Sequence, residues 1–352
     1  GIILFTMSNS EKKHIVTQND VAREAGVTRS MVSYVISGTA ERSVAPETRR
    51  RILDAIEKLG YRPNKAAQAL QQGDVAFASK KIGVVLCNAD VFRRPYYAEI
   101  LSGIHTVAYE HKYQVAFIRF FEELRDPVLF NELIHPEEIG GLILVSTDQV
   151  LKTDDDYKIL STIRERIPKI VCIDWKCEGL TNILFDRQEA AYKASEYLFH
   201  QGYNDIGYIG ENDERVLGVR QSLLERGIFT SEKDFYLVQA FNMTGGYDGV
   251  RELLKTRSLP RAVVCGSDEV AIGVMSCLNE RKISIPEQVA IISIDNIETA
   301  SYTTPPLTTI NVQKTAMGAR AVEAIVGSRD KKTAFEPVNI LLPTSIVVRK
   351  SC

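Results

Sequence analysis

The sequence predicts a small all-α head followed by a larger two-lobed α/β body, in which helices cover parallel sheets. Three observations lead to this expectation. The 352 residues are 45% hydrophobic, which is enough apolar material for several cores. Residues 11–72 carry 11 Lys/Arg against 7 Asp/Glu, while the whole chain has a net charge of −2, so a basic head precedes an acidic body. Beyond residue 80, short apolar runs alternate with amphipathic stretches.

Two short helices joined by a tight turn are expected within residues 15–36. Thr17 is a suitable N-cap for the first helix, and Gly26 stands where a helix ends in the left-handed region. Thr28 then caps a second helix, over residues 29–36. The spacing Ala22-x3-Gly26-x5-Val32-x2-Val35 is that of a helix-turn-helix, although two packed helices can also match it by chance.

A third helix and a string of residues after it extend this pattern. Pro46 suits the first position of a helix that Gly60 closes, and the string Gly60-Tyr61-x-Pro63-Asn64…Ala67-x-x-Leu70 follows. Together with Asp20-Val21-Ala22…Ala25-Gly26-Val27…Val32-Ser33, it closely resembles the DNA-binding head of the lactose/galactose repressor family. The resemblance covers more than fifty residues of the head.

The resemblance implies how the head would bind an operator. Arg29, Ser30 and Tyr34 would face base edges in the major groove, although many relatives carry an arginine at the Tyr34 position. In the family, a hinge helix orders on DNA and enters the minor groove, where a leucine opens a base step. The hinge would here carry Asn64, Ala67 and Leu70. The phosphate-contacting candidates are Thr17, Asn19, Thr28 and Ser33. An ordinary linker helix and a solvated surface charge at Arg29 are the alternatives.

The body reads as two similar series of strands and helices. Strand-like runs are expected at residues 81–86, 114–118, 141–145, 169–173, 205–209, 262–265 and 289–294. Amphipathic helices are expected at residues 96–110, 188–201, 217–226, 244–255 and 270–280. Ligands bind such folds where the strand ends of two lobes face each other.

The resemblance continues through the body, which is similar to periplasmic sugar-binding proteins. Its matching segments include Arg215-x-x-Gly218, Gly266-Ser267-Asp268 and Ile294-Asp295-Asn296. The resemblance assigns to effector binding Tyr96, Tyr97, Trp175, Arg215, Phe241, Asp268 and Asp295. Asp268 as a helix cap, Asp295 as a turn residue and Trp175 as core are the alternatives. Arg94 stands where relatives usually carry an asparagine, and together with Arg93 before it favours an anionic ligand or a partner surface.

The sequence therefore predicts an allosteric, cytoplasmic repressor and no enzyme. Expected partners are pseudopalindromic operator DNA, a second copy of the chain in a homodimer, and an effector that is a sugar, phosphosugar or nucleobase. A phosphoprotein corepressor is an alternative, as is a solute-binding protein or sugar-metabolising enzyme on the same body. No cofactor, metal site or membrane association is expected. The expected divisions are a disordered leader (1–14), the head (15–62), hinge and linker (63–79) and the body (80–352), with lobes at 80–183 plus 312–329 and 184–311 plus 330–352.

Overall fold

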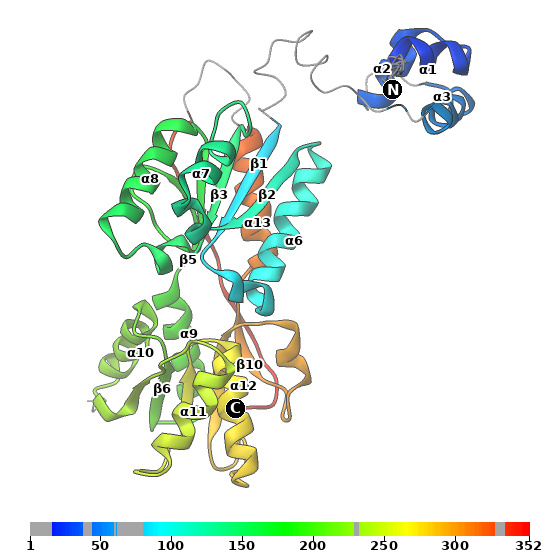
Figure 1. Ribbon diagram of the computed structural model, residues 1–352. Coiled ribbons are helices and arrows are strands. Elements are labelled where there is room, and N and C mark those ends of the chain that lie inside the picture. Colours follow the sequence, from blue (N-terminus) through cyan, green and yellow to red (C-terminus); the bar gives the residue numbers. More distant parts are fainter. Residues whose placement is uncertain (1–15, 38–43, 60, 62–79, 229–231, 328–334) are drawn as a thin grey trace, which may run out of the picture. The chain divides into compact units, whose positions relative to one another are not determined.

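In the computed structural model, the chain divides into two compact units, Gly1–Phe77 and Ala78–Cys352. The structure describes residues 16–37, 44–59, 61, 80–228, 232–327 and 335–352 (Figure 1). The expected leader (1–14) and the expected hinge and linker (63–79) lie outside these ranges, and so do Asn64, Ala67 and Leu70.

In the described part of the head, three helices pack together: α1 (Gln18–Ala25), α2 (Arg29–Ser37) and α3 (Pro46–Leu59). Helix α1 packs against both of the others. Val21, Val32 and Ile52, one from each helix, are completely buried in the shared core. The helix-turn-helix spacing therefore places its apolar residues inside, as expected from the sequence.

The body contains two six-stranded sheets, in the orders β11-β5-β4-β3-β1-β2 and β12-β10-β9-β8-β6-β7. Every strand pair is parallel except β10 with β12. The first sheet comprises β1 (Lys81–Leu86), β2 (Gln114–Phe120), β3 (Gly141–Val145), β4 (Ile170–Ile173), β5 (Thr181–Phe185) and β11 (Asn339–Leu342). The second comprises β6 (Ile206–Gly210), β7 (Phe235–Leu237), β8 (Ala262–Cys265), β9 (Ala290–Asp295), β10 (Thr308–Asn311) and β12 (Ser345–Val347).

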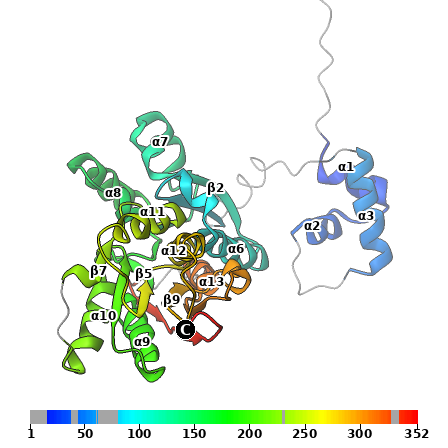
Figure 2. The ribbon, with the colours of Figure 1, turned by 90° about the horizontal axis from the view of Figure 1, so that it is seen from below.

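Each sheet and its helices make one lobe of the body (Figure 1). The first lobe carries α6 (Pro95–Glu110), α7 (Pro127–Leu133), α8 (Asp154–Arg166) and α13 (Lys314–Gly327). The second carries α9 (Arg187–His200), α10 (Glu214–Glu225), α11 (Met243–Leu253) and α12 (Asp268–Glu280). Within the second lobe, α9 packs on α10 and α11 on α12 (Figure 2). This architecture confirms the predicted fold class.

Short 3-10 turns link several of these elements. They are η1 (Ala89–Arg93), η2 (Phe121–Arg125), η3 (Thr147–Val150), η4 (Glu232–Asp234) and η5 (Glu298–Tyr302). Within the described ranges, no helix combines the length and apolar composition that a bilayer crossing requires.

Glycines allow the closest helix contact of the first lobe, between α6 and α13. A Cβ at Gly103 would lie 2.0 Å from the carbonyl oxygen of Thr315, and one at Gly318 would lie 2.1 Å from the carbonyl oxygen of Ile100. Neither position has room for a side chain. This packing fixes the start of α6, which carries Tyr96 and Tyr97, relative to the segment that enters α13 from the second lobe.

The chain passes between the lobes after β5, after β10 and again between β11 and β12. The expected assignment of residues 330–352 to the second lobe is wrong for β11, which pairs in parallel with β5 in the first sheet. The apolar run Asn339–Leu342 completes the first sheet before the chain returns. Since β5 leads directly into the second lobe and its neighbours run parallel to it, the carboxyl ends of the first sheet's strands face the second lobe.

Candidate functional site

The start of the helix-turn-helix is fixed by a reciprocal cap. The Thr17 backbone N–H and hydroxyl donate to the Asp20 carboxylate at 2.9 and 2.7 Å, and the Asp20 backbone N–H donates to the Thr17 hydroxyl at 3.4 Å. Helix α1 ends at Gly26, whose φ of 64° lies in the left-handed region. Thr17, expected at a phosphate, is therefore also the N-cap of α1.

Helix α2 presents an exposed end and a buried face. Arg29 and Ser30 are exposed, as are Thr28 just before the helix and Asn19 on α1. Val32 and Val35 are buried in the head core. Ser33 and Tyr34 are half-buried, so Tyr34 is less accessible than the sequence suggested.

Two neighbours of the predicted DNA-reading residues were not expected from the sequence. Met31 is 41% exposed on α2, where an apolar side chain is available for a thymine methyl group. Gln18 accepts a bond from Arg29 Nε at 3.4 Å, which links α1 to the first residue of α2. Helical spacing alone does not separate such outward apolar residues from core ones.

In the body, Tyr96 and Tyr97 form an aromatic wall at the start of α6. Their rings meet edge to face with centroids 5.3 Å apart, and both residues are buried. Burial raises the pKa of both phenols, which therefore stay protonated. Gln149 donates to the Tyr97 hydroxyl at 3.3 Å, whereas the buried Tyr96 hydroxyl has no hydrogen-bond partner among the residues that the structure describes.

The second lobe contributes Arg215 and Phe241. Asp213 caps α10 by accepting the Arg215 backbone N–H at 3.0 Å and also pairs with the Arg215 guanidinium. That guanidinium lies over the Phe241 ring, 5.1 Å from its centroid. Arg215 is buried and no described residue accepts a hydrogen bond from its Nε, which leaves one fixed N–H donor for a ligand.

Asp295 ends β9 with a φ of 124°, a left-handed conformation that is strained for a residue with a side chain. Buried Lys314 donates to its backbone carbonyl oxygen. No hydrogen bond joins its carboxylate to any residue that the structure describes. Burial and the nearby Asp268 raise its pKa well above the ordinary value, although Arg215, Lys314 and Arg94 act in the opposite direction.

Asp268 and Trp175, two further expected effector contacts, are instead engaged within their own lobes. The Asp268 carboxylate accepts the hydroxyls of Ser293 and Thr309, both at 2.5 Å, and the Ile297 N–H at 2.7 Å. Trp175 lies in the first lobe's core and donates its Nε1–H to the Leu144 carbonyl oxygen at 3.2 Å. The position of Trp175 agrees with the alternative of a core residue, whereas Asp268 does not cap its helix: the N-cap of α12 is Ser267, which accepts the Val270 N–H.

The sequence did not identify two ion pairs that join the lobes. Arg94 Nε donates to Glu269 Oε2 at 2.7 Å, and this guanidinium also approaches the Tyr97 and Phe241 rings. Arg187, at the start of α9, donates to Asp174 Oδ1 at 2.9 Å in the first lobe. Arg94 and Glu269 are 175 positions apart, so no local pattern could reveal their contact.

Four buried side-chain atoms lack any hydrogen-bond partner within the described ranges. They are the Tyr96 hydroxyl, Thr147 Oγ1, Arg187 Nε and Arg215 Nε. Each follows the carboxyl end of a strand: β1, β3, β5 and β6, respectively. Buried polar groups are normally paired, so four partnerless ones at strand ends indicate a site for a polar ligand.

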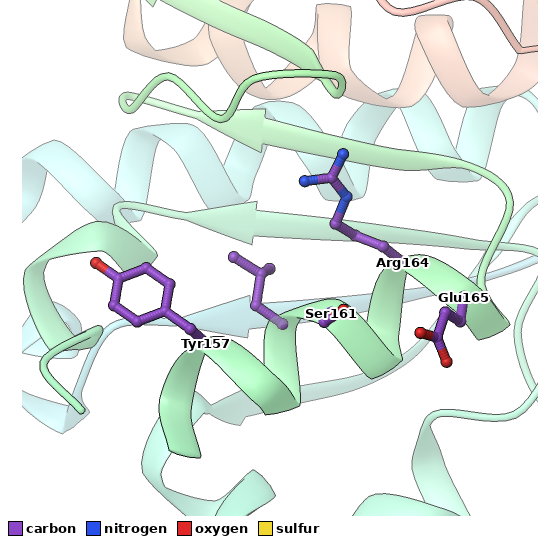
Figure 3. Close-up of a pocket in the computed structure, with 5 residues that line it drawn as sticks. Tyr157, Ser161, Arg164 and Glu165 are labelled. Carbon is purple, nitrogen blue, oxygen red and sulfur yellow. The ribbon is translucent and has the colours of Figure 1, made fainter. Parts of the chain in front are cut away.

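A separate groove of about 360 Å³ lies on α8 and is lined by Tyr157, Leu160, Ser161, Arg164 and Glu165 (Figure 3). Arg164 and Glu165 leave the helix in different directions. None of the four partnerless atoms belongs to this groove, which makes it a weaker candidate than the group at the strand ends.

Comparisons with known proteins agree with both parts of the molecule. Residues 17–64 match the model described as "Bacterial regulatory proteins, lacI family", and residues 195–352 match "Periplasmic binding protein-like domain". The HTH-type transcriptional repressor PurR of Pasteurella multocida (strain Pm70) is 30% identical over 345 residues, covering 96% of this chain and 98% of that protein.

Solved structures of transcriptional regulators have a similar fold. The transcriptional regulator CelR in complex with cellobiose is 26% identical with a TM-score of 0.66, covering 96% of this chain and 100% of that one. The lac repressor dimer bound to operator and the anti-inducer ONPF has the same fold, at 23% identity and a TM-score of 0.72, covering 96% of this chain and 99% of that one. The chain belongs to the lacI family of bacterial regulatory proteins and is a DNA-binding transcriptional regulator with an effector-binding body.

Proposed function

We propose that this chain is a dimeric repressor that binds a pseudopalindromic operator and is switched by an uncharged, hydroxyl-rich effector, a sugar, held between the lobes of the body. The four partnerless polar atoms at the strand ends carry the effector part of the proposal. The exposed Arg29 and Ser30 on a helix seated by Val32 and Val35 support the DNA part.

On DNA, helix α2 would lie in the major groove of each half-site. Arg29 has the geometry for a two-bond contact with guanine, and Ser30 and Tyr34 would complete the base contacts. Asn19, Thr28 and Ser33 would donate to phosphates, which fix the register of the helix, and Thr17 would join them by turning its hydroxyl from Asp20 to a phosphate. Asn64, Ala67 and Leu70 of the two subunits would enter the minor groove and open a base step there. A twofold dimer explains why the site would be a pseudopalindrome.

The effector contacts would divide between apolar walls and fixed polar groups. Tyr96, Tyr97 and Phe241 provide aromatic faces for the apolar side of a sugar ring. Asp295 provides a carboxylate acceptor for hydroxyls, and Arg215 provides the Nε donor. Asp268 and Trp175 would act indirectly, by holding the strand ends in place.

Charge balance favours a neutral ligand over an anion. The guanidinium groups of Arg94, Arg187 and Arg215 are each paired with a carboxylate. The spare arginine charge that a phosphosugar would require is therefore already neutralised. The alternative effectors are a phosphosugar, a nucleobase and a phosphoprotein corepressor.

Control of DNA binding would follow from lobe closure. An effector that contacts Tyr96 and Tyr97 in one lobe and Arg215 and Asp295 in the other changes the free energy of closure. Because binding is reciprocal, the operator must alter effector affinity by the same factor that the effector alters operator affinity.

Selection from random DNA duplexes with the full chain tests the proposal. The selected sequence should be a pseudopalindrome, with an affinity that falls steeply with salt concentration, as phosphate contacts require. Sugars, phosphosugars and nucleobases would then be screened by the melting temperature and by operator affinity. A saturating sugar should raise the melting temperature and change operator affinity. A non-palindromic sequence contradicts the DNA proposal, and a response to phosphosugars, nucleobases or a phosphoprotein alone contradicts the effector proposal.

A further inference from the structure

Arg94 is held at the junction of the lobes by three groups of different origin. Its Nε donates to Glu269 in the second lobe at 2.7 Å. Its guanidinium carbon lies 5.3 Å from the centroid of the Tyr97 ring in the first lobe and 6.0 Å from that of Phe241 in the second. The neighbouring Arg93, by contrast, is exposed. Only the second of these two consecutive arginines is therefore part of the interlobe group.

The Arg94–Glu269 pair is well shielded from water. The side chain of Arg94 is 19% exposed and that of Glu269 is 5% exposed. Burial, the largest single effect, lowers the pKa of the guanidinium, but the charge and hydrogen bond of Glu269 together with Tyr97 and Asp295 outweigh it, so the pKa is raised and Arg94 stays charged. An ion pair at this depth is screened little by salt, and removing either partner would leave an uncompensated charge.

The position of the pair connects it with effector choice. Arg94 stacks near the two aromatic rings assigned above as effector walls, and Asp295 is close enough to contribute to its pKa. A phosphate or carboxylate entering between these rings would compete with Glu269 for the same guanidinium. Glu269 already satisfies that cation, and its negative charge repels an incoming anion.

We propose that Glu269 is a specificity-determining residue: by pairing with Arg94 across the lobes, it makes the effector site reject anions and accept uncharged ligands. The inference rests on the proposed function, because it assumes that the effector enters between Tyr97 and Phe241. It assigns a role in specificity to Glu269, which the sequence did not place in the site, and to Arg94, which the sequence associated with an anionic ligand or a partner surface.

The test converts the site into an anion site by one substitution and uses inorganic sulfate as the probe. Glu269→Gln keeps the size of the side chain and leaves Arg94 without its counter-charge. Melting temperatures would be measured for the full chain in sulfate and in chloride at matched ionic strength, with sulfate binding measured by calorimetry. Sulfate stabilises proteins in general by exclusion from their surface, but that effect rises gradually and does not saturate.

Glu269→Gln should bind sulfate saturably, at least about tenfold more tightly than the wild type, which corresponds to about 1.4 kcal/mol. The wild type should show only the gradual increase, as should the controls Arg93→Ala and Glu287→Gln, since both replaced residues are exposed. The double variant Arg94→Ala/Glu269→Gln lacks both charges and should lose the saturable binding.

Saturable sulfate binding by the wild type, its absence from Glu269→Gln, or its persistence in the double variant would overturn the proposal. If Glu269→Gln folds only when sulfate is present, the proposal is supported, because the anion then replaces the missing carboxylate. If it stays unfolded in sulfate while the double variant folds, the proposal is contradicted. Operator binding and the sugar response of the wild type do not enter this test, so a failure here is distinguishable from a failure of the proposed function.

Discussion

Asp268 and Asp295 are two buried carboxylates at neighbouring strand ends, and replacing each with asparagine should have different consequences. Both substitutions remove a buried carboxyl group whose pKa is raised by burial. Both variants therefore avoid the free-energy cost of ionising a carboxyl group inside the protein. They differ in hydrogen bonding. Asp268 accepts three bonds, whereas no described residue donates to the Asp295 carboxylate.

The difference in stability between the two variants follows from the hydrogen bonds that each of them loses. An asparagine at 268 can still accept from Ser293 and Thr309 through its oxygen. Its amide N–H would then face the Ile297 N–H, which now donates to Asp268 at 2.7 Å. A buried donor without an acceptor costs about 1–3 kcal/mol. We therefore expect Asp268→Asn to be about 1–3 kcal/mol less stable than Asp295→Asn, and Asp295→Asn to be at least as stable as the wild type.

Urea unfolding at pH 7 measures the stability of both variants, with Asp154→Asn, at an exposed position of α8, as the control for amide substitution. Melting temperature with a saturating sugar measures the effector response. Asp295→Asn should fold normally and lose the response, whereas Asp268→Asn should be less stable and keep it. Equal stabilities, or a sugar response that survives in Asp295→Asn and disappears in Asp268→Asn, would refute the division of roles.

Three further outcomes are expected. Gly103→Ala should lower the free energy of unfolding by about 1–3 kcal/mol in urea, because its Cβ meets the Thr315 carbonyl oxygen, while Gly327→Ala, with open space around it, should change little. The pKa of Asp268 is about 6 in the folded chain against 3.8 ordinarily, so protonation favours folding. The free energy of unfolding of the wild type relative to Asp268→Asn should therefore be greatest at or below pH 4 and fall by about 2 kcal/mol between pH 4 and pH 6; a constant difference would show that Asp268 titrates normally. Arg29→Ala should weaken operator binding by about 1–3 kcal/mol and relax the preference at one base pair, whereas the control Lys58→Ala should leave that preference unchanged. Competition with duplexes substituted at single base pairs measures the preference.

Sequence patterns predicted the features that depend on neighbours in the chain. Gly26 ends α1 because the left-handed turn favours glycine, and Val32 and Val35 face the core because helical spacing places them there. The strands β1 and β3 and the helix α12 follow from continuous or periodic apolar runs in the same way. Such features are specified within a few residues and need no knowledge of the tertiary fold.

Features that depend on distant contacts could not be predicted in this way. Strand β11 joins β5 across more than 150 positions, and Arg94 meets Glu269 across 175. The identity of a residue also does not show which hydrogen bonds its side chain forms in the folded protein. Asp268 and Asp295 look equivalent in the sequence, but one carboxylate is fully engaged within its lobe and the other is not.

We propose that the DNA-binding head and the side chains at the strand ends of the two lobes take part in one coupled equilibrium. This coupling is tested most directly by measuring operator affinity of the full chain by fluorescence anisotropy, with and without a saturating sugar, and sugar affinity with and without a saturating operator duplex. We expect the two affinities to change by the same factor, and Asp295→Asn to bind the operator but no longer respond to the sugar. A sugar that binds without any change in operator affinity, or an unaltered response in Asp295→Asn, would contradict it.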